Sequence, residues 1–493
     1  MGLHLFNTLS RSLESFRPLE EGRVGVYACG PTIYGPAHIG NFRAFVFYDL
    51  VHRTLEWLGL EVRFVMNFTD VDDKTIRAAA ERGLTLEPYT APFAEAFLAE
   101  ADALGITRFD LYPRATHYVE EMKALVQRLL DRGMAYQTED GSVFFDISSF
   151  PDYGKLSGKD LEQVRTGERV ADDEYGKEDT RDFALWKGAK AGDEEVGAAW
   201  DAPWGRGRPG WHLECSAMAL SEVGTTVDIH LGGEDLVFPH HEDEIAQSEG
   251  ATGEPFVRTW LHVKHLRVEG RKMSKSLGNF ITVRELLDEG VSPAAIRHQL
   301  LSAHYRSELN FTREGLEASD RAVNRLLDFE ARLAALPGVP PHGGGPAGPG
   351  GPAGEEDALQ EAAEEAMARF SAALRDDLNV PEGMAAVFVL LNQVNVLLDR
   401  GPDEVSPAGV HAVREALGSM DRILGLLEVG RRSRTVDPEL AAWVENRLLQ
   451  RSEARASRDW ARADEIREEL SGQGIAIEDT PQGTRWKRVG ETG

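Results

Sequence analysis

The chain has 493 residues and a formal net charge of −28, from 54 lysines and arginines against 82 aspartates and glutamates. Its 42% hydrophobic and 28% charged residues are typical of a globular protein with several domains and exclude a disordered chain. Two cysteines exclude a disulfide framework and favour a cytoplasmic location. No apolar run reaches the ~18 residues of a membrane span, and we expect no secretory signal.

The N-terminal region predicts a strand, a helix and a second strand. Residues 24–29 form a short β-like run that ends in Gly30 and Pro31. From about Gly40 to Leu58, apolar residues recur every three or four positions, as on one face of a helix, and Gly59 ends the pattern. Alternating apolar residues over 62–68 predict the second strand. The order indicates a βαβ unit of a parallel, doubly wound α/β sheet.

The second half of the chain begins with a compositional break. Residues 337–354 are rich in glycine and proline and predict a linker. Three helical ladders follow over 359–374, 387–398 and 410–427, the last opened by the cap pair Ser406 and Pro407, and together they predict a helical bundle. A charged helical stretch to about Leu470 precedes a predicted hairpin, whose strands are residues 475–477 and 485–488.

The segment GPTIYGPAHIGN, residues 30–41, lies where the first strand meets the first helix. Backbone N–H groups at a helix N-terminus form an anion site. His38 and Asn41 are three residues apart and face the same side of the first turn, and Gly40 allows a ligand to approach the backbone. A Gly/Pro turn with a capping histidine is the alternative interpretation.

The segment RKMSKSLGN, residues 271–279, suits a mobile loop that folds over a polyphosphate. Lys272 and Lys275 supply positive charge, and the serines supply hydroxyl donors. Residues 258–276 carry six basic side chains and one acid, an excess that favours a polyanionic ligand in so acidic a protein. A solvated charged loop is the alternative.

A third cluster has the residue types of a metal site. His240 and Glu244 are four residues apart, on one face of a helix that Pro239 could begin. Cys215 lies upstream, and Cys29 joins them only if the sheet brings it there. Two thiolates, an imidazole and a carboxylate suit Zn²⁺ better than Mg²⁺ or Ca²⁺. Core packing of the cysteines and a surface His/Glu pair are the alternatives.

The HIGN and KMSKS segments, with their spacing, resemble the signatures of class I aminoacyl-tRNA synthetases. Further segments are similar to the cysteinyl-tRNA synthetase family: YACGPTIYGPAHIGN, NFTDVDD, RPGWHLECSAM, GGEDLVFPHHEDEIAQSE, HYRSELNF and EDTPQGTRW. They are spread over nearly the whole chain. The resemblance implies a Rossmann-type catalytic domain over 1–312 with a connective insertion at about 115–205. It also implies a helical bundle over 313–430, interrupted by the linker at 337–354, and a C-terminal anticodon-binding domain over 431–493.

The resemblance also implies a reaction. L-Cysteine and ATP, accompanied by Mg²⁺, give cysteinyl-adenylate and pyrophosphate, and the cysteinyl group passes to the 3′ end of tRNA(Cys). One Zn²⁺ per chain is implied, with Cys29, Cys215, His240 and Glu244 as ligands. The spacing of four residues to Glu244 favours His240 over His241 as the ligand.

The resemblance carries further residue roles. The implied catalytic residues are His38, Asn41, Lys272 and Lys275; the ATP site is Gly40, Gly232, Gly233, Asp235 and Lys275; the cysteine pocket is Thr69, Trp211 and His230. The class signature ends in histidine where this chain has Asn41. Because asparagine can also donate a hydrogen bond, we expect altered detail and intact activity.

Zinc would solve the problem of telling cysteine from serine. Size alone separates near-isosteres by only ~10–200-fold. A thiolate is a far better zinc ligand than a neutral hydroxyl. We therefore expect the substrate sulfur to bind the zinc directly, without an editing domain.

Three other functions remain possible from the sequence. The cysteine:glucosaminyl-inositol ligase of mycothiol synthesis has a similar catalytic core, but it would not need the tail after Arg431. A methionyl-tRNA synthetase would carry CxxC knuckles, which this chain lacks, and a non-catalytic tRNA-binding relative would have decayed signatures. We expect a monomer whose Arg431–Arg432 and Arg485–Arg488 patches contact the tRNA, with salt-dependent affinity.

Overall fold

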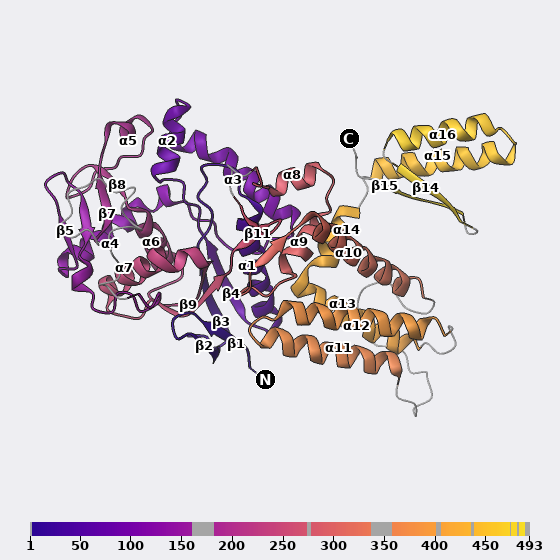
Figure 1. The fold of residues 1–493 in the computed structure, drawn as a ribbon, viewed down its shortest axis with the longest axis horizontal. Coiled ribbons are helices and arrows are strands. Elements are labelled where there is room, and N and C mark those ends of the chain that lie inside the picture. Colours follow the sequence, from indigo (N-terminus) through magenta and orange to yellow (C-terminus); the bar gives the residue numbers. More distant parts are fainter. Residues whose placement is uncertain are drawn as a thin grey trace.

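The computed structural model describes residues 2–159, 182–273, 278–336, 357–400, 406–434, 438–473, 475–480 and 483–488. At its centre is a four-stranded, all-parallel sheet in the order β10-β9-β3-β4 (Figure 1). Its strands are β3 (Arg23–Ala28), β4 (Glu61–Met66), β9 (Val227–Gly233) and β10 (Val257–Val263). Helix α1 (Ile39–Trp57) connects β3 to β4. The predicted βαβ unit and α/β fold class are confirmed.

The sheet forms because its strands are apolar on both faces, as expected when helices cover both sides. Val26, Ala28, Phe64 and Met66 are buried along β3 and β4, and they share one core with α1. The parallel order places the carboxyl ends of all four strands at one edge. Ligands of doubly wound sheets bind in the crevice outside that edge.

An inserted region lies on the β9 side of the central sheet, at the left in Figure 1. Its antiparallel sheet has the order β5-β6-β7-β8. The strands are β5 (Ala135–Gln137), β6 (Val143–Phe145), β7 (Phe183–Gly188) and β8 (Gly207–Pro209), and the neighbouring helices are α4 (Val119–Asp131), α5 (Ala191–Glu195), α6 (Trp211–Glu222) and α7 (Glu242–Thr252). A second apolar core, which includes Leu125, Phe145 and Trp186, joins this region to the sheet.

Shorter elements surround the central sheet. An N-terminal hairpin pairs β1 (His4–Asn7) with β2 (Ser12–Ser15), and a three-stranded sheet has the order β12-β11-β13. The remaining elements are α2 (Asp73–Glu81), α3 (Leu86–Ala103), β11 (Leu266–Val268), β12 (Arg271–Lys272), α8 (Val283–Asp288), α9 (Pro293–Leu301) and β13 (Leu309–Phe311). The predicted glycine- and proline-rich linker lies outside the described residues.

A helical bundle follows the α/β region. Its helices are α10 (Arg313–Ala334), α11 (Ala358–Arg375), α12 (Val380–Leu398), α13 (Pro407–Leu424) and α14 (Leu426–Arg434). The predicted cap is confirmed, because the Ser406 side chain accepts a hydrogen bond from the Gly409 N–H at 2.8 Å. The prediction of one ladder over 410–427 is wrong: Gly425 adopts a left-handed φ of 66° and divides it into α13 and α14.

Helix α12 is long and apolar enough to cross a membrane, by length and composition alone. Its window is 44% buried, and Val387, Leu391 and Val394 contribute to the apolar core that the bundle shares with the catalytic region. A core helix of a bundle has these same features.

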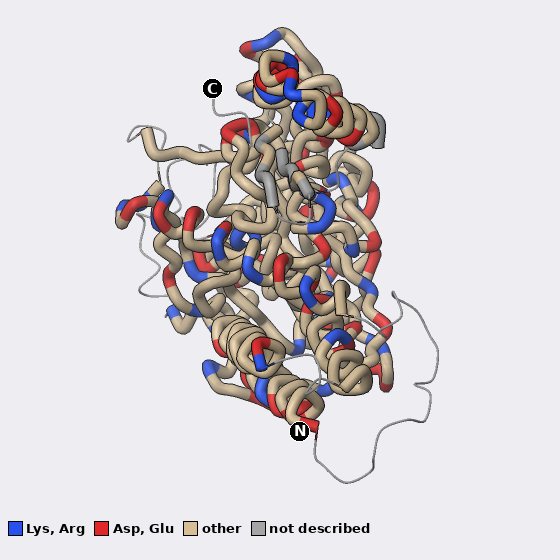
Figure 2. The backbone as a smooth tube through the Cα atoms, turned by 90° about the vertical axis from the view of Figure 1, so that its right-hand side faces the viewer, with Lys and Arg blue, Asp and Glu red and all other residues tan. Residues whose placement is uncertain are grey.

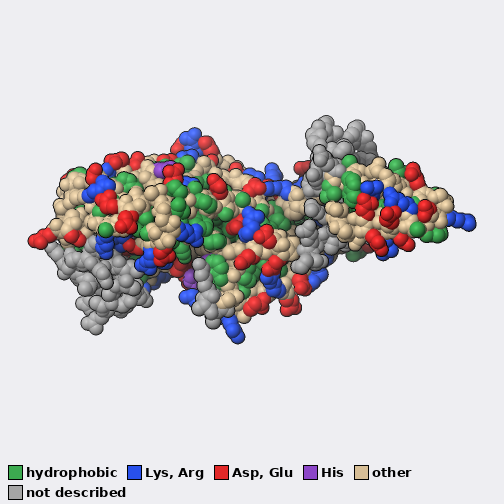
Figure 3. Space-filling model, turned by 90° about the horizontal axis from the view of Figure 1, so that it is seen from above, with side chains coloured by type: hydrophobic (Ala, Val, Ile, Leu, Met, Phe, Trp, Pro, Cys, Tyr) green, Lys and Arg blue, Asp and Glu red, His purple; other side chains and the backbone are tan. Residues whose placement is uncertain are grey.

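The C-terminal unit projects from the main body (Figures 1 and 3). It consists of α15 (Pro438–Ala456), α16 (Trp460–Gly472) and the antiparallel pair β14 (Ile475–Thr480) and β15 (Gly483–Arg488). The predicted hairpin is confirmed. Val444, Ile466 and Leu470 belong to a separate small core. Acidic and basic residues are interspersed along the backbone in Figure 2, so the acidic residues behind the net charge of −28 form no single patch in that view.

A buried ionic network joins α1 to the bundle. Asp49 Oδ2 accepts from Arg53 Nε at 2.7 Å and from an Arg297 amino group at 2.5 Å. Arg297 also donates to the carbonyl of Leu424, and Arg53 to the carboxylate of Glu428. The network therefore links the helix that starts at the sheet edge to the end of α13 and the start of α14.

Candidate metal centre and nucleotide cleft

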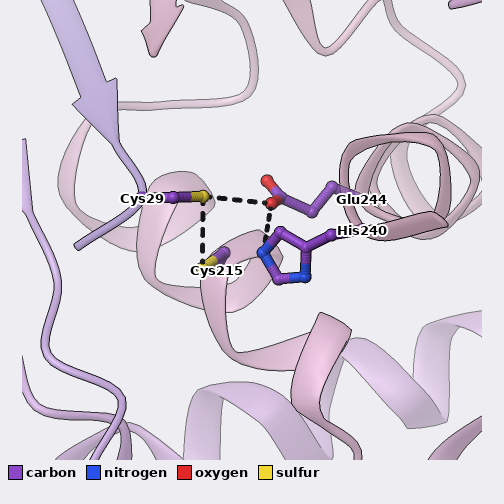
Figure 4. A group of neighbouring side chains, drawn as sticks. All are labelled: Cys29, Cys215, His240 and Glu244. Carbon is purple, nitrogen blue, oxygen red and sulfur yellow. Dashed lines mark hydrogen bonds and ion pairs between the residues drawn. The ribbon is translucent and has the colours of Figure 1, made fainter. Parts of the chain in front are cut away.

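The four predicted metal ligands converge at the carboxyl edge of the sheet (Figure 4). Cys29 directly follows β3, Cys215 lies in α6, and His240 and Glu244 come from the turn before α7 and from α7 itself. All four side chains are buried, and their donor atoms lie within 4.8 Å of one another. The cysteine on the first strand is brought to the others by the parallel pairing of β3 with β9.

The contacts within the group are short. The Cys29 thiol is 3.8 Å from the Cys215 sulfur and 3.5 Å from Glu244 Oε1. His240 Nε2 is 2.9 Å from the same carboxylate oxygen. Two sulfurs, an imidazole nitrogen and a carboxylate oxygen around one point are the donor types and the number that tetrahedral zinc prefers.

The kink before the metal-site helix lies at Phe238. Residues Val237–His241 form a π-helical turn in which only Phe238 has non-helical backbone angles, so helical backbone runs from Pro239, as predicted, into α7, whose α-helical part begins at Glu242. The Glu242 carboxylate is buried and accepts hydrogen bonds from the backbone N–H groups of residues 154, 156 and 157. The inserted region thereby anchors the start of α7 and, with it, the position of Glu244.

Burial and neighbouring charges shift the pKa values of these four side chains. Burial raises the pKa of the Cys29 thiol well above its usual range, whereas the hydrogen bond from Cys29 lowers the pKa of Cys215 to about 6. Burial opposes the charge of His240, but Glu244 and Cys215 raise its pKa to about 10. Burial also opposes the charge of Glu244, but His230 and His240 lower its pKa to about 2. Negative donors gather here at full burial, which favours a cation among them.

Sequence reasoning missed a chain of polar side chains behind the metal group. His241 Nε2 lies 3.3 Å from Cys29 Sγ, and its Nδ1 is 2.7 Å from His262 Nε2. His262 Nδ1 is 2.8 Å from the Thr8 hydroxyl. The HH dipeptide marked His241, but no pattern marked Thr8, because it lies more than two hundred residues away in sequence.

The predicted cysteine-pocket residues lie around the metal group. His230 Nε2 is 2.8 Å from Glu244 Oε2. Trp211 stacks on the His240 ring, with centroids 4.5 Å apart, and is itself 39% exposed to solvent. Thr69 is buried, and its hydroxyl accepts a hydrogen bond from Asn67. Asn67 Oδ1 also accepts from the Gly30 N–H at 2.9 Å and lies 3.7 Å from the Cys215 sulfur, a role that the sequence did not reveal.

The HIGN segment caps helix α1. The Asn41 N–H donates to His38 Nδ1, and the His38 N–H donates to Asn41 Oδ1, both at 3.1 Å. Asn41 uses its side-chain oxygen as the acceptor in this reciprocal cap, and the donor capacity predicted for it resides in its NH2 group. A Cβ at Gly40 would lie 3.0 Å from His38 Nδ1, so the glycine keeps this cap uncrowded.

The GGED segment, residues 232–235, covers the last two residues of β9 and the two that follow it. A Cβ at Gly232 would lie 2.2 Å from the His241 ring, and one at Gly233 would lie 2.5 Å from the Asp235 carboxylate. Gly232 is therefore needed for packing against the buried histidine, in addition to the ATP-site role predicted for it. Lys272 is exposed on β12, and Lys275 lies outside the described residues.

The predicted tRNA patch at the bundle end is ion-paired. Arg432 contacts Asp102 at 2.6 Å, and Arg431 lies 3.7 Å from Glu330 and from Asp421. These pairs join α14 to α3, α10 and α13. The Arg485–Arg488 segment forms β15, and its arginine and lysine side chains are not among those described.

Comparisons with known proteins agree over the whole chain. Residues 15–321 match the tRNA synthetases class I (C) catalytic domain, residues 369–428 the DALR domain, and residues 437–486 the cysteinyl-tRNA ligase anticodon binding domain. Cysteine–tRNA ligases of Symbiobacterium thermophilum and Koribacter versatilis are 47% and 44% identical, over 99% of this chain and 100% of each relative. That of Chlamydia pneumoniae is 43% identical over 99% of this chain and 98% of the relative.

Solved structures resemble this fold at much lower identity. A methionyl-tRNA synthetase of Mycobacterium tuberculosis has a TM-score of 0.59 at 16% identity and covers 82% of this chain and 90% of its own. A leucyl-tRNA synthetase of Agrobacterium radiobacter has a TM-score of 0.60 at 12% identity, with coverages of 84% and 86%. These support the class I fold. The full-length identities and the three matched domains show that the chain is a ligase of the cysteine–tRNA ligase family, within the class I aminoacyl-tRNA synthetases.

Proposed function

We propose that this ligase selects L-cysteine by coordinating the substrate thiolate to a zinc ion held by the donor set Cys29, Cys215, His240 and Glu244. It then activates the amino acid with Mg²⁺-ATP and transfers it to tRNA(Cys). The observation that carries the proposal is the convergence of those four buried donors, from three separate chain segments, beside the nucleotide edge of the sheet. When bound, the zinc supplies a Lewis acid that favours sulfur over oxygen.

The chain's own residues would shape the amino-acid pocket. His230, at hydrogen-bond distance from Glu244, fixes the orientation of that carboxylate. Trp211 and Thr69 bound the space next to the metal group. Asn67 contacts both Gly30 and Cys215 and so helps to fix their positions. A rigid ligand set discriminates between substrates better than a flexible one.

Nucleotide activation would use the N-terminus of α1. Displacement at the α-phosphate builds negative charge on the leaving pyrophosphate. The reciprocal cap of His38 and Asn41 orders the first turn, so its remaining N–H groups are preorganised toward that charge. We propose that Lys272 and Lys275 add positive charge from the loop that follows β12, while Gly40, Gly233 and Asp235 line the ATP site.

The C-terminal unit supports tRNA as the acceptor. Residues 437–486 match an anticodon-binding domain, which the mycothiol ligase would not require. We propose that this unit and the Arg485–Arg488 strand bind the anticodon region, and that the enzyme works as a cytoplasmic monomer. Because phosphate contacts release counterions, tRNA affinity should fall steeply as salt rises.

The test is Cys215→Ser in the full-length protein, with His117→Asn as a control at an exposed histidine that is not one of the four donors. We expect the affinity for zinc to fall, and pyrophosphate exchange to lose its discrimination between cysteine and serine. The control should keep both. Unchanged zinc affinity and unchanged discrimination in Cys215→Ser would refute the zinc mechanism.

A further inference from the structure

A second group of metal-type donors overlaps the first. Cys29, His230, His241 and Glu244 also place their donor atoms within 4.8 Å of one another, and all four are buried. Among the described residues, these two quartets are the groups of histidine, cysteine and acidic side chains close enough to hold one ion. They share Cys29 and Glu244, and they differ in that Cys215 and His240 are replaced by His230 and His241.

The shared carboxylate faces both groups. Glu244 Oε1 is 2.9 Å from His240 Nε2, on the side of the donor set proposed above. Glu244 Oε2 is 2.8 Å from His230 Nε2, on the opposite side. His241 Nε2 is 3.3 Å from Cys29 Sγ and 4.0 Å from Glu244 Oε1. One carboxylate can therefore serve either quartet without moving its backbone.

One histidine of the second quartet, His241, is held as metal ligands are held, whereas His230 Nδ1 has no hydrogen-bond partner among the described residues and its ring is held by stacking. A ligating histidine ordinarily uses its other ring nitrogen in a hydrogen bond, which fixes the tautomer and the ring. His241 Nδ1 makes this contact with His262, which in turn contacts Thr8. His230 stacks on Trp260, with centroids 4.5 Å apart, so its ring cannot turn freely.

We propose that Cys29, His230, His241 and Glu244 form an inner metal set. It takes a divalent ion such as Zn²⁺ when the outer set, which is Cys29, Cys215, His240 and Glu244, is broken or not yet filled. The inner set shares ligands with the outer one, so the proposal rests in part on the proposed function. Because His230 is one of its ligands and also borders the proposed cysteine pocket, an ion there engages a side chain that the pocket uses. The inner set thus defines an inactive, metal-holding state of the enzyme.

The two sets differ in sulfur count, which makes them distinguishable. The outer set contains two thiolates, and the inner set contains one. Co²⁺ replaces Zn²⁺ in such sites, and its thiolate charge-transfer absorption grows with the number of sulfur ligands. Metal-stripped full-length protein would be titrated with Co²⁺ alone, with equilibrium dialysis for stoichiometry, absorption for sulfur ligation and circular dichroism for folding.

In the variant C215S/H240N, the inner set should still bind one Co²⁺ per chain, with a thiolate band about half as intense as in the unmodified protein. Adding His241→Asn should then weaken Co²⁺ binding by at least about tenfold. A folded C215S/H240N protein that binds no Co²⁺, or one whose affinity ignores His241→Asn, would overturn the inner set.

Where that variant does not fold, His240→Asn alone carries the test. Its bound Co²⁺ should show the single-thiolate band, because the inner set excludes Cys215; retention of the two-thiolate band would overturn the proposal. Failure of the proposed function looks different. In that case the unmodified protein would bind no Co²⁺, or it would show the band of a single thiolate that Cys215→Ser leaves unchanged.

Discussion

The catalytic core holds two separate buried polar clusters, one around Asp49 and one around Glu244, and they are built on different principles. Around Asp49, positive and negative side chains pair with one another, and the remaining guanidinium N–H groups reach backbone carbonyls of Leu104, Gly105 and Leu424. Around Glu244, two sulfurs, a carboxylate and several imidazoles face one another, with the positive charge of His240 as their internal counterion.

The difference teaches how to separate a structural cluster from a functional one. In the Asp49 network two arginines balance two carboxylates, so it supports a domain junction without calling for a further ion. A cluster of excess donors at full burial is costly unless a cation enters it. The predictions that follow test this distinction, from the largest expected effect to the smallest.

Arg297→Ala should give the largest loss of stability. It removes a buried cation that pairs with Asp49 and spans α1, α9 and the end of α13. Breaking a buried pair by removing one partner costs about 3–5 kcal/mol, because the other charge stays buried. Urea unfolding of the full-length protein would measure the loss. The zinc content of the folded fraction should stay unchanged. A loss of zinc would contradict the independence of the two clusters.

Removal of zinc with a chelator should have the next largest effect. An ion that binds only the folded state stabilises it by about 2.7 kcal/mol at a free concentration one hundred times its Kd. We therefore expect the melting temperature to fall on chelation and to recover on adding zinc. Chelator treatment of a Cys29→Ser/Glu244→Gln variant, which lacks the two ligands that both quartets share, is the control and should change little. An equal drop in both proteins would show that the chelator acts elsewhere.

Gly232→Ala should disturb the metal cluster by steric contact alone. Its new Cβ would lie 2.2 Å from the His241 ring, and overpacking of a rigid core costs roughly 1–3 kcal/mol. The matched control is Gly418→Ala, on a helix where a Cβ meets nothing within 4 Å. Thermal unfolding should separate the two variants. Equal stability of both would mean that the His241 ring can move aside.

Glu100 tests a third case, a buried acid on α3 whose charge is poorly compensated. Burial raises its pKa to about 7, with Arg284 offsetting only part of the effect. A carboxyl whose folded pKa exceeds its unfolded pKa stabilises the fold below the unfolded value, and this contribution is lost as pH rises through 7. Glu100→Gln should therefore gain stability relative to the parent at pH 8 but not at pH 4. Denaturant unfolding at both values checks the sign.

Arg432→Ala should have the smallest effect. Its pair with Asp102 is 43% and 60% exposed at the two side chains, and exposed pairs contribute about 0–1 kcal/mol. A double-mutant cycle with Asp102→Ala would measure the coupling. Aminoacylation as a function of tRNA concentration adds the second readout. If Arg432 contacts the tRNA, Arg432→Ala would raise the KM for tRNA and leave pyrophosphate exchange unchanged.

Much of the fold followed from local patterns. The alternation over 62–68, the ladder from Gly40 to Leu58 and the Ser406–Pro407 cap each reflect short-range rules of helices and strands. The division of α13 from α14 escaped, because the ladder continues through Gly425 and only its left-handed backbone shows the break. The turn before α7 escaped for a similar reason, since Pro239 marks a helix start but not the irregular geometry around it.

The amino-acid sequence by itself determined which chemistry is present: two cysteines, an HHEDE run, a helix-capping HIGN and a lysine-rich loop. Tertiary structure decided which of these side chains meet. Parallel strand order alone carried Cys29 to Cys215 and Glu244, and strand β10 carried His262 between His241 and Thr8. The physical reason is that residue type and spacing fix local conformation, whereas contacts between distant segments depend on the order in which strands pair.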